Sequence, residues 1–186
     1  MTLKRVYRKT AVTSQSGMTL IEVLITVAIL ALVIYPIYEF LNQGIRSWEI
    51  AENKTEVVQN ARIGLDRMCD EIKHAREFYT ISPAQIRFWW QDINDDNTAD
   101  SNEILSYSWS GTSGDDLLRQ FDSEPQASPL ANYVDFFQLT YYDKNGTVTA
   151  SPSKVWLLSA ELRVKKSGKE ADYTSTMRKA VHPRNR

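Results

Sequence analysis

Residues 17–38 read GMTLIEVLITVAILALVIYPIY, an apolar run that begins directly after a glycine and holds one charged side chain, Glu22. About 20 apolar residues allow a helix to cross the hydrocarbon core of a bilayer. Residues 18–38 supply that length, so we expect them to form a membrane-spanning helix. A carboxylate inside such a helix costs about 2.5 to 3.5 kcal/mol. We therefore expect Glu22 to lie at the headgroup level or to have a positively charged partner.

The segment before the apolar run is basic, because Lys4, Arg5, Arg8 and Lys9 precede it without any acidic residue. The positive-inside rule places this segment in the cytoplasm and sends the C-terminal part across the membrane as a single-pass protein. A secretory signal peptide would show a small-residue cleavage site after its apolar segment. Here the apolar pattern continues past residue 38 without such a site, so cleavage at that end is not expected.

The charge balance restricts the partners of the exported part. The whole chain has a formal net charge of −1. The charged side chains among its first 17 residues are all basic, so the remainder of the chain is mildly acidic. A mildly acidic domain has no general affinity for a nucleic acid backbone, and no direct nucleic acid binding is expected. The chain has one cysteine, Cys69, which excludes an intramolecular disulfide. We expect Cys69 to be a small buried residue rather than a reactive thiol.

The fold class predicted from the periodicity is α+β, a long N-terminal helix packed on an antiparallel β-sheet domain. Apolar residues recur three or four positions apart as far as Ala75, which predicts an amphipathic helix over residues 39–79. From residue 80 the period becomes two, which predicts a β-rich globular domain over residues 80–186. The expected strands are 85–90, 104–109, 116–121, 133–142, 147–150, 154–165 and 173–181. Tight turns are expected at 143–146 and 166–169, and a surface loop at 122–131.

The N-terminal residues carry a resemblance to a known family. Gly17, an apolar residue and then Thr19-Leu20-Ile21-Glu22 resemble the class III signal of type IV pilins and type II secretion pseudopilins. The resemblance implies that a prepilin peptidase removes residues 1–17 as a cytoplasmic leader peptide and that the new N-terminal residue, Met18, is N-methylated. It also implies that Glu22 pairs with the N-terminal amine of a neighbouring subunit. Met18 stands where the family usually has Phe.

The later part of the chain resembles the PilW-type minor pilins and the J-type minor pseudopilins. The similar features are the helix containing residues 61–65, the strand 133–142 that ends in an Asn-Gly turn, and the closing segment 181–185. The resemblance implies a minor subunit at the tip or in the initiation of a pilus or pseudopilus, anchored in the bacterial inner membrane. Its expected partners are other major and minor pilins and the inner-membrane assembly platform. The alternative is a single-pass, membrane-anchored, calcium-dependent binding or adhesion module that does not polymerise.

A second motif indicates metal binding. Between residues 92 and 103, oxygen-bearing side chains fall at positions 1, 3, 5, 9 and 12, which is the spacing of an EF-hand loop. The candidate Ca²⁺ ligands are Asp92, Asn94, Asp96, Thr98, Asp100 and Glu103. Asn97 occupies position 6, where glycine is expected, and Asn tolerates the left-handed conformation. Because the flanks read as strands, we predict a calcium loop within a hairpin. The alternative is a solvated acidic surface loop.

Enzymatic activity is not expected. His74 and His182 occur in unrelated sequence contexts, and the sequence contains neither a glycine-rich phosphate loop nor a Ser-His pattern. We therefore expect an assembly or binding protein without catalytic residues.

Overall fold

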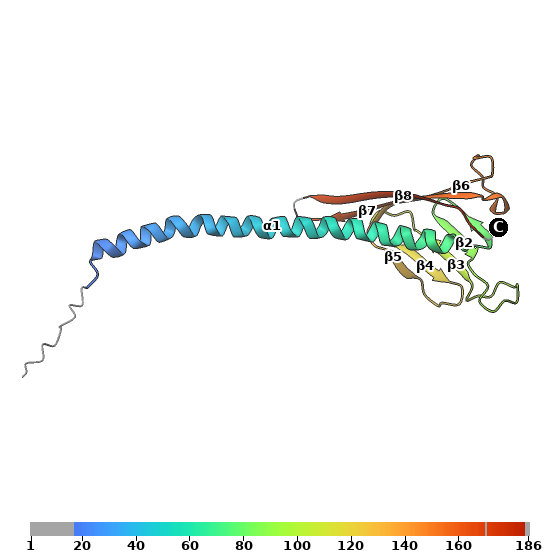
Figure 1. Ribbon diagram of the computed structural model, residues 1–186, viewed down its shortest axis with the longest axis horizontal. Helices are drawn as coiled ribbons and strands as arrows, with labels where there is room; N and C mark the ends of the chain where they lie inside the picture. Colours follow the sequence, from blue (N-terminus) through green and yellow to red (C-terminus); the bar gives the residue numbers. More distant parts are fainter. Residues whose placement is uncertain (1–16, 170, 185–186) are drawn as a thin grey trace, which may run out of the picture. The chain divides into compact units, whose positions relative to one another are not determined.

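The computed structural model describes residues 17–169 and 171–184, and Figure 1 shows its elements. They are, in chain order, α1 (Leu20–Ile72), β1 (Glu77–Ile81), β2 (Gln85–Trp89), β3 (Ile104–Ser108), β4 (Leu117–Phe121), β5 (Ser128–Ala131), β6 (Val134–Tyr142), a 3₁₀ turn (Pro152–Lys154), β7 (Leu157–Ser167) and β8 (Asp172–Val181). The chain divides into two compact units, Met1–Ser47 and Trp48–Arg186. The predicted leader peptide, except Gly17, lies outside the described residues.

The helix α1 is continuous from Leu20 to Ile72, with Pro36 inside it. The predicted long N-terminal helix is therefore confirmed, but it ends at Ile72 rather than at residue 79. The reason lies in the pairing that follows. The Arg76 N–H donates to the Trp89 carbonyl (2.8 Å), and the chain then enters β1, which pairs with β2. Backbone bonds to a neighbouring strand replace those that a longer helix would have made.

The first sheet contains five antiparallel strands in the order β1-β2-β3-β4-β5. Its three inner strands match the predicted strands to within a residue at each end. The two edge strands, β1 and β5, differ from the prediction, because they lie where the sequence predicts the end of the amphipathic helix and the surface loop 122–131. Each edge strand pairs with its neighbour through an irregular register.

The second sheet contains β6, β7 and β8, again antiparallel, and the pairing of β7 with β8 confirms the hairpin predicted around the turn 166–169. The turn at 143–146 is also confirmed: Gly146 has a φ of 77°, and its N–H donates to the Asp143 carbonyl (3.0 Å). The strand predicted at 147–150 is wrong, because this segment pairs through a single bridge between Tyr142 and Val148. The strand predicted from Lys154 begins at Leu157, after the 3₁₀ turn.

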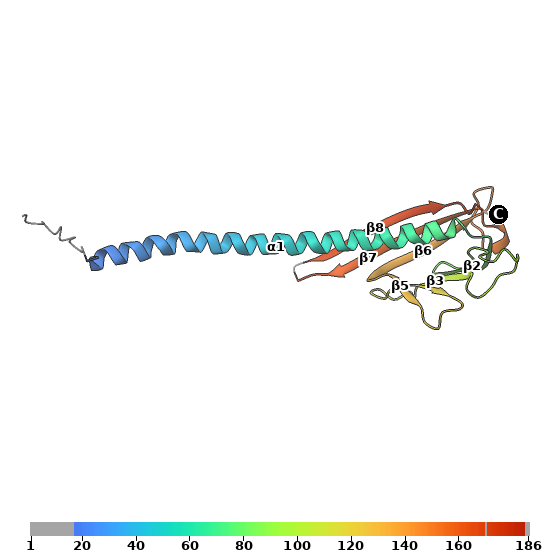
Figure 2. The same ribbon diagram turned by 60° about the horizontal axis from the view of Figure 1, so that its bottom comes forward.

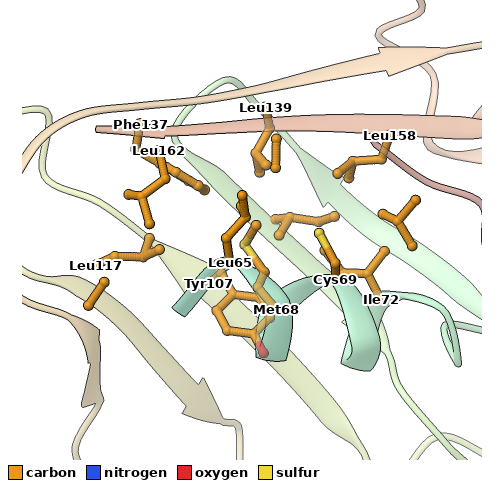
Figure 3. Close-up of a cluster of buried hydrophobic side chains, with 14 of the residues drawn as sticks. Leu65, Met68, Cys69, Ile72, Tyr107, Leu117, Phe137, Leu139, Leu158 and Leu162 are labelled. Atoms are coloured by element: carbon orange, nitrogen blue, oxygen red, sulfur yellow. The ribbon is translucent and has the colours of Figure 1, made fainter. Parts of the chain in front are cut away.

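The core of the second unit forms where α1 meets both sheets. The buried residues of α1 are Val57, Ala61, Gly64, Leu65, Met68, Cys69 and Ile72. Figure 3 shows side chains of this helix among Leu139 and Leu158 of the second sheet and Leu117 of the first. Burying each large apolar side chain stabilises the fold by about 1.5 to 3 kcal/mol. Cys69 is fully buried, as expected from the sequence.

Backbone hydrogen bonds join β6 of the second sheet to two connecting segments of the first sheet. The Leu139 N–H donates to the Pro83 carbonyl (2.8 Å), and the Val134 N–H donates to the Asp115 carbonyl (3.0 Å). The β7–β8 hairpin is tied to α1 by ion pairs of Lys166 with Glu56 (2.5 Å) and of Lys179 with Asp66 (2.7 Å). In Figure 2 this hairpin runs alongside α1. The second unit therefore has its own core and its own polar ties.

Candidate functional site

The start of α1 is capped by its own Glu22. The Thr19 N–H donates to Glu22 Oε2 (3.4 Å), and the Glu22 N–H donates to the Thr19 carbonyl (3.1 Å). A Glu that reaches back to the N–H of the N-cap threonine makes one half of a capping box. Among the described residues, no basic side chain pairs with this carboxylate. Glu22 therefore has a local structural role that the resemblance did not predict.

The apolar side chains between Met18 and Ile45 are exposed, and Leu20, for example, has 82% of its surface accessible. In the described part of the chain, α1 is the one helix that is long and apolar enough to cross a membrane, judged by length and composition. None of its most apolar stretch is buried. An apolar surface of this extent is typical of contact with lipid or with other proteins. These features are consistent with a membrane-anchored protein.

The candidate calcium loop connects β2 to β3. The strand pair Trp89–Ile104 closes it, and the Trp90 N–H donates to the Glu103 carbonyl (2.8 Å). Asn97 has a φ of 62°. It therefore adopts the left-handed conformation that the sixth position of a calcium loop requires.

Glu103 lies beneath the loop with 1% of its surface exposed. Its Oε1 accepts the Ile93 N–H (2.6 Å), and its Oε2 accepts Trp89 Nε1–H (3.1 Å) and the Asp100 N–H (3.3 Å). No basic side chain among the described residues forms an ion pair with it. Burial of a charge is costly unless the charge is paired and hydrogen-bonded. Glu103 has the hydrogen bonds but lacks a cationic partner within that part of the chain.

Asp92 is the second buried carboxylate of the loop, with 2% of its side chain exposed. Its Oδ2 accepts Arg76 Nη1–H (2.9 Å) and the Asn97 N–H (3.1 Å). Its Oδ1 is buried and has no hydrogen-bond partner among the described residues. The Arg76 guanidinium also lies over the Trp89 ring, 5.1 Å from its centroid. One oxygen of Asp92 is thus fully engaged, and the other is left without a partner.

The exposed side chains of the loop are held together by Asn94. Its Nδ2 donates to Asp96 Oδ2 (3.0 Å) and to Asp100 Oδ2 (3.1 Å). Thr98 Oγ1 and the Thr98 N–H both donate to Asp96 Oδ1 (2.6 and 2.8 Å). These bonds from Thr98, and then the bond from Asn94, lower the pKa of the Asp96 carboxyl. All six predicted ligands therefore lie in one loop between two paired strands.

In the part of the chain that the structure describes, no three His, Cys, Asp or Glu side chains converge as a metal-binding group. The carboxylates of Asp96 and Asp100 meet the Asn94 amide instead of each other. The contacts of Arg76 with Asp92 and of Trp89 with Glu103 are not predictable from the loop sequence. These contacts depend on the pairing of β2 with its neighbours, for which the loop sequence gives no signal.

Comparison with protein-family models matched residues 12–34 to the "Prokaryotic N-terminal methylation motif". This match contains Gly17, Met18 and Glu22. No curated protein matched the chain. The motif supports a type IV pilin-like protein that a prepilin peptidase processes, and the match covers the start of the chain alone. The matched residues end at Ile34, so the likeness to PilW-type and J-type minor subunits rests on the sequence pattern alone.

Proposed function

We propose that the chain is a minor pilin or minor pseudopilin of the bacterial inner membrane. Prepilin peptidase cuts it after Gly17, and Met18 becomes the N-methylated first residue. The mature subunit joins other major and minor pilins, with the inner-membrane assembly platform, in a type IV pilus-like or type II secretion pseudopilus filament. Its place is at the tip of the filament or in its initiation. No step of this role requires a catalytic residue.

The observation that carries this proposal is the methylation motif at residues 12–34, continued by an exposed apolar helix. The helix begins at Leu20, three positions after the glycine of the motif, and its apolar side chains remain exposed as far as Ile45. A subunit that moves from a bilayer into a filament needs such a surface in both environments. The basic residues before Gly17 favour a cytoplasmic leader, with the second unit in the periplasm or outside the cell.

The proposal is tested by following processing in cells that also produce a prepilin peptidase. The wild-type chain is expected to lose residues 1–17 and to gain one methyl group on Met18, both visible by intact-mass spectrometry. Gly17→Ala should keep the precursor mass, because a side chain at this position blocks the peptidase. The matched control is Gly44→Ala, a glycine of α1 where an added Cβ meets no atom within 4 Å. This variant should be cut like the wild type.

Normal maturation of Gly17→Ala would contradict the proposed cleavage site. A wild-type chain that stays uncut beside an active peptidase would contradict the filament role itself. That result would favour the alternative function, a membrane-anchored binding or adhesion module that does not polymerise.

A further inference from the structure

We propose that the β2–β3 loop binds one Ca²⁺ ion through Asp92 Oδ1, Asn94, Asp96, the Thr98 carbonyl, Asp100 and Glu103, and that the ion orders this loop. This inference does not depend on filament assembly. It applies equally to a pilin and to a membrane-anchored module.

The unpartnered oxygen of Asp92 carries the proposal. Asp92 Oδ2 accepts the N–H of Asn97 from across the loop and Nη1–H of Arg76 from outside it. Its Oδ1 is buried without a hydrogen-bond partner in the described residues. An unsatisfied buried acceptor costs about 1 to 3 kcal/mol, and more when it is charged. A cation at this point removes that cost.

Glu103 gives the same indication from the other end of the loop. It is 1% exposed and has no basic partner among the described residues, although its neighbour in the loop, Asp92, is also an acid. Position 12 of a calcium loop is a Glu that binds the ion through both oxygens. The N–H groups of Ile93 and Asp100 hold the Glu103 carboxylate under the loop. They fix its orientation without neutralising its charge.

The Asn94 amide lies between the carboxylates of Asp96 and Asp100, where a cation would interact favourably with both. Its Nδ2 donates to both Asp96 and Asp100, whose negative charges would otherwise repel each other. Rotation of this amide by half a turn about its last bond replaces the NH₂ group with the oxygen. Asn94 then becomes a ligand beside Asp96 and Asp100. The same three side chains thus make a closed arrangement without the ion and an oxygen-lined one with it.

The ligand chemistry favours Ca²⁺. Carboxylate, amide and backbone carbonyl oxygens in a flexible loop suit a cation that accepts six to eight oxygens at 2.3 to 2.6 Å. Mg²⁺ requires tighter octahedral geometry and gives up its waters reluctantly. Calcium loops of extracellular modules bind with dissociation constants of about 10⁻⁴ to 10⁻³ M. We expect this loop to fall in that range.

The experiment uses the full-length chain in detergent micelles after treatment with a chelator. Isothermal titration with CaCl₂ is expected to show one site per chain, and the melting temperature should rise with Ca²⁺. A parallel titration with MgCl₂ should show binding at least about tenfold weaker, because of its stricter geometry. Absence of a Ca²⁺ site at concentrations up to about 10 mM, well above the expected range, overturns the proposal.

Three variants separate coordination from general charge. Asp100→Asn and Glu103→Gln each remove one ligand charge and should weaken Ca²⁺ binding by about tenfold or more. The matched control is Asp95→Asn, which removes the same charge from a non-ligand position. Asp95 has a φ of 58°, and Asn tolerates this conformation. Asp95→Asn should bind within about twofold of the wild type, since it changes no ligand.

Equal losses in Asp95→Asn and Asp100→Asn would show diffuse attraction by an acidic surface and would overturn the proposal. Glu103 also holds three N–H donors, so its substitution carries a risk to folding. Asp100 is exposed, and its side chain bonds only Asn94 among the described residues. If Asp100→Asn in chelator melts at the same temperature as the chelated wild type, the variant is folded. Its weaker Ca²⁺ binding then reports the loss of a ligand.

Discussion

Among single residues, Arg119 shows how the second unit accommodates a charge near its core. The Arg119 side chain is 9% exposed, and its Nε and Nη2 donate to the Glu71 carboxylate (3.0 Å each for the shortest contacts). The Tyr107 hydroxyl donates to the same carboxylate. Burial, and then the charge of Glu71, raise the pKa of Tyr107, so that its hydroxyl stays protonated and remains a donor. The three residues link α1 to β3 and β4.

Glu71→Met should lower the free energy of unfolding by about 3 kcal/mol, because a buried ion pair that loses one partner leaves an uncompensated charge. The control is Glu161→Met, which removes the partner of Arg178, a side chain that is 72% exposed. This substitution should lower the free energy of unfolding by less than about 1 kcal/mol, because the ion pair is solvent-exposed. Denaturant titration of both variants in the same detergent measures the difference. The double variant Glu71→Met/Arg119→Met should regain part of the loss, and equal costs for the two single variants would refute the explanation.

The candidate metal loop was predictable from the sequence only in its spacing. Asp92 to Glu103 have the positions of a calcium loop, and this pattern is local. The burial of Glu103 under the loop was not predictable, because it depends on the bond from Trp89 across the paired strands. The contact of Arg76 with Asp92 was equally unpredictable, because Arg76 lies between α1 and β1 whereas Asp92 lies between β2 and β3. Tertiary partners decide which acids of the loop are solvated and which are buried.

Among the secondary-structure elements, the contact of α1 with β5 depends on a glycine. A Cβ on Gly64 would lie 3.0 Å from the Ala131 Cβ and 3.3 Å from the Leu130 carbonyl oxygen. The helix therefore approaches the edge strand more closely than a residue with a larger side chain would allow. The Asn60 side chain adds hydrogen bonds to the Asn132 backbone just beyond β5.

Gly64→Val should destabilise the second unit by about 1 to 3 kcal/mol, since added carbons in a well-packed contact force backbone shifts. Gly44→Val is the matched control, because an added Cβ there meets no atom within 4 Å. Valine has a slightly better helix propensity than glycine, so this control should change stability by less than about 0.5 kcal/mol. Thermal unfolding followed by circular dichroism compares the two. A harmless Gly64→Val would mean that α1 and β5 can separate without loss.

The elements that sequence analysis identified are those with their own periodicity. In β7, Leu158, Ala160, Leu162 and Val164 are buried and alternate with more exposed residues, so this strand was evident. The two missed strands are both edges of the first sheet. β5 contains Pro129, which cannot donate to a ladder and is found in sheets mainly at edges, so its sequence reads as a loop. β1 was missed because the predicted helix, residues 39–79, extends four residues past Ala75, where its apolar pattern ends.

For the molecule as a whole, the two units differ in the surface that they present. The described part of the first unit, residues 17–47, exposes its apolar side chains, whereas the second unit has a core of buried apolar residues. A chain with both features has one part suited to lipid or to neighbouring helices and one that folds on its own contacts. Glu22 is the acid in the apolar run of the first unit, so assembly is expected to depend on it.

Glu22→Gln separates the two roles of this residue. Glutamine can still reach back to the Thr19 N–H as the partner in a capping box, but it has no charge. We expect normal cleavage and membrane insertion with a loss of co-purification with other pilins of at least about tenfold, the factor that corresponds to 1.4 kcal/mol. Glu39→Gln makes the same charge change elsewhere on α1 and should assemble normally. Wild-type recovery of Glu22→Gln in filament preparations would show that capping, rather than charge, is what Glu22 supplies.

The burial of Cys69 has a practical consequence for mapping how copies of the chain meet their neighbours. Cys69 is the single thiol of the chain, and burial raises its pKa to about 11, so it stays protonated and shielded at neutral pH. Copies of the folded protein therefore have no accessible thiol with which to form disulfide cross-links. When one cysteine is introduced on α1 and another on a partner subunit, any disulfide between the two subunits must therefore join the introduced cysteines. Each band on a non-reducing gel identifies two positions that touch.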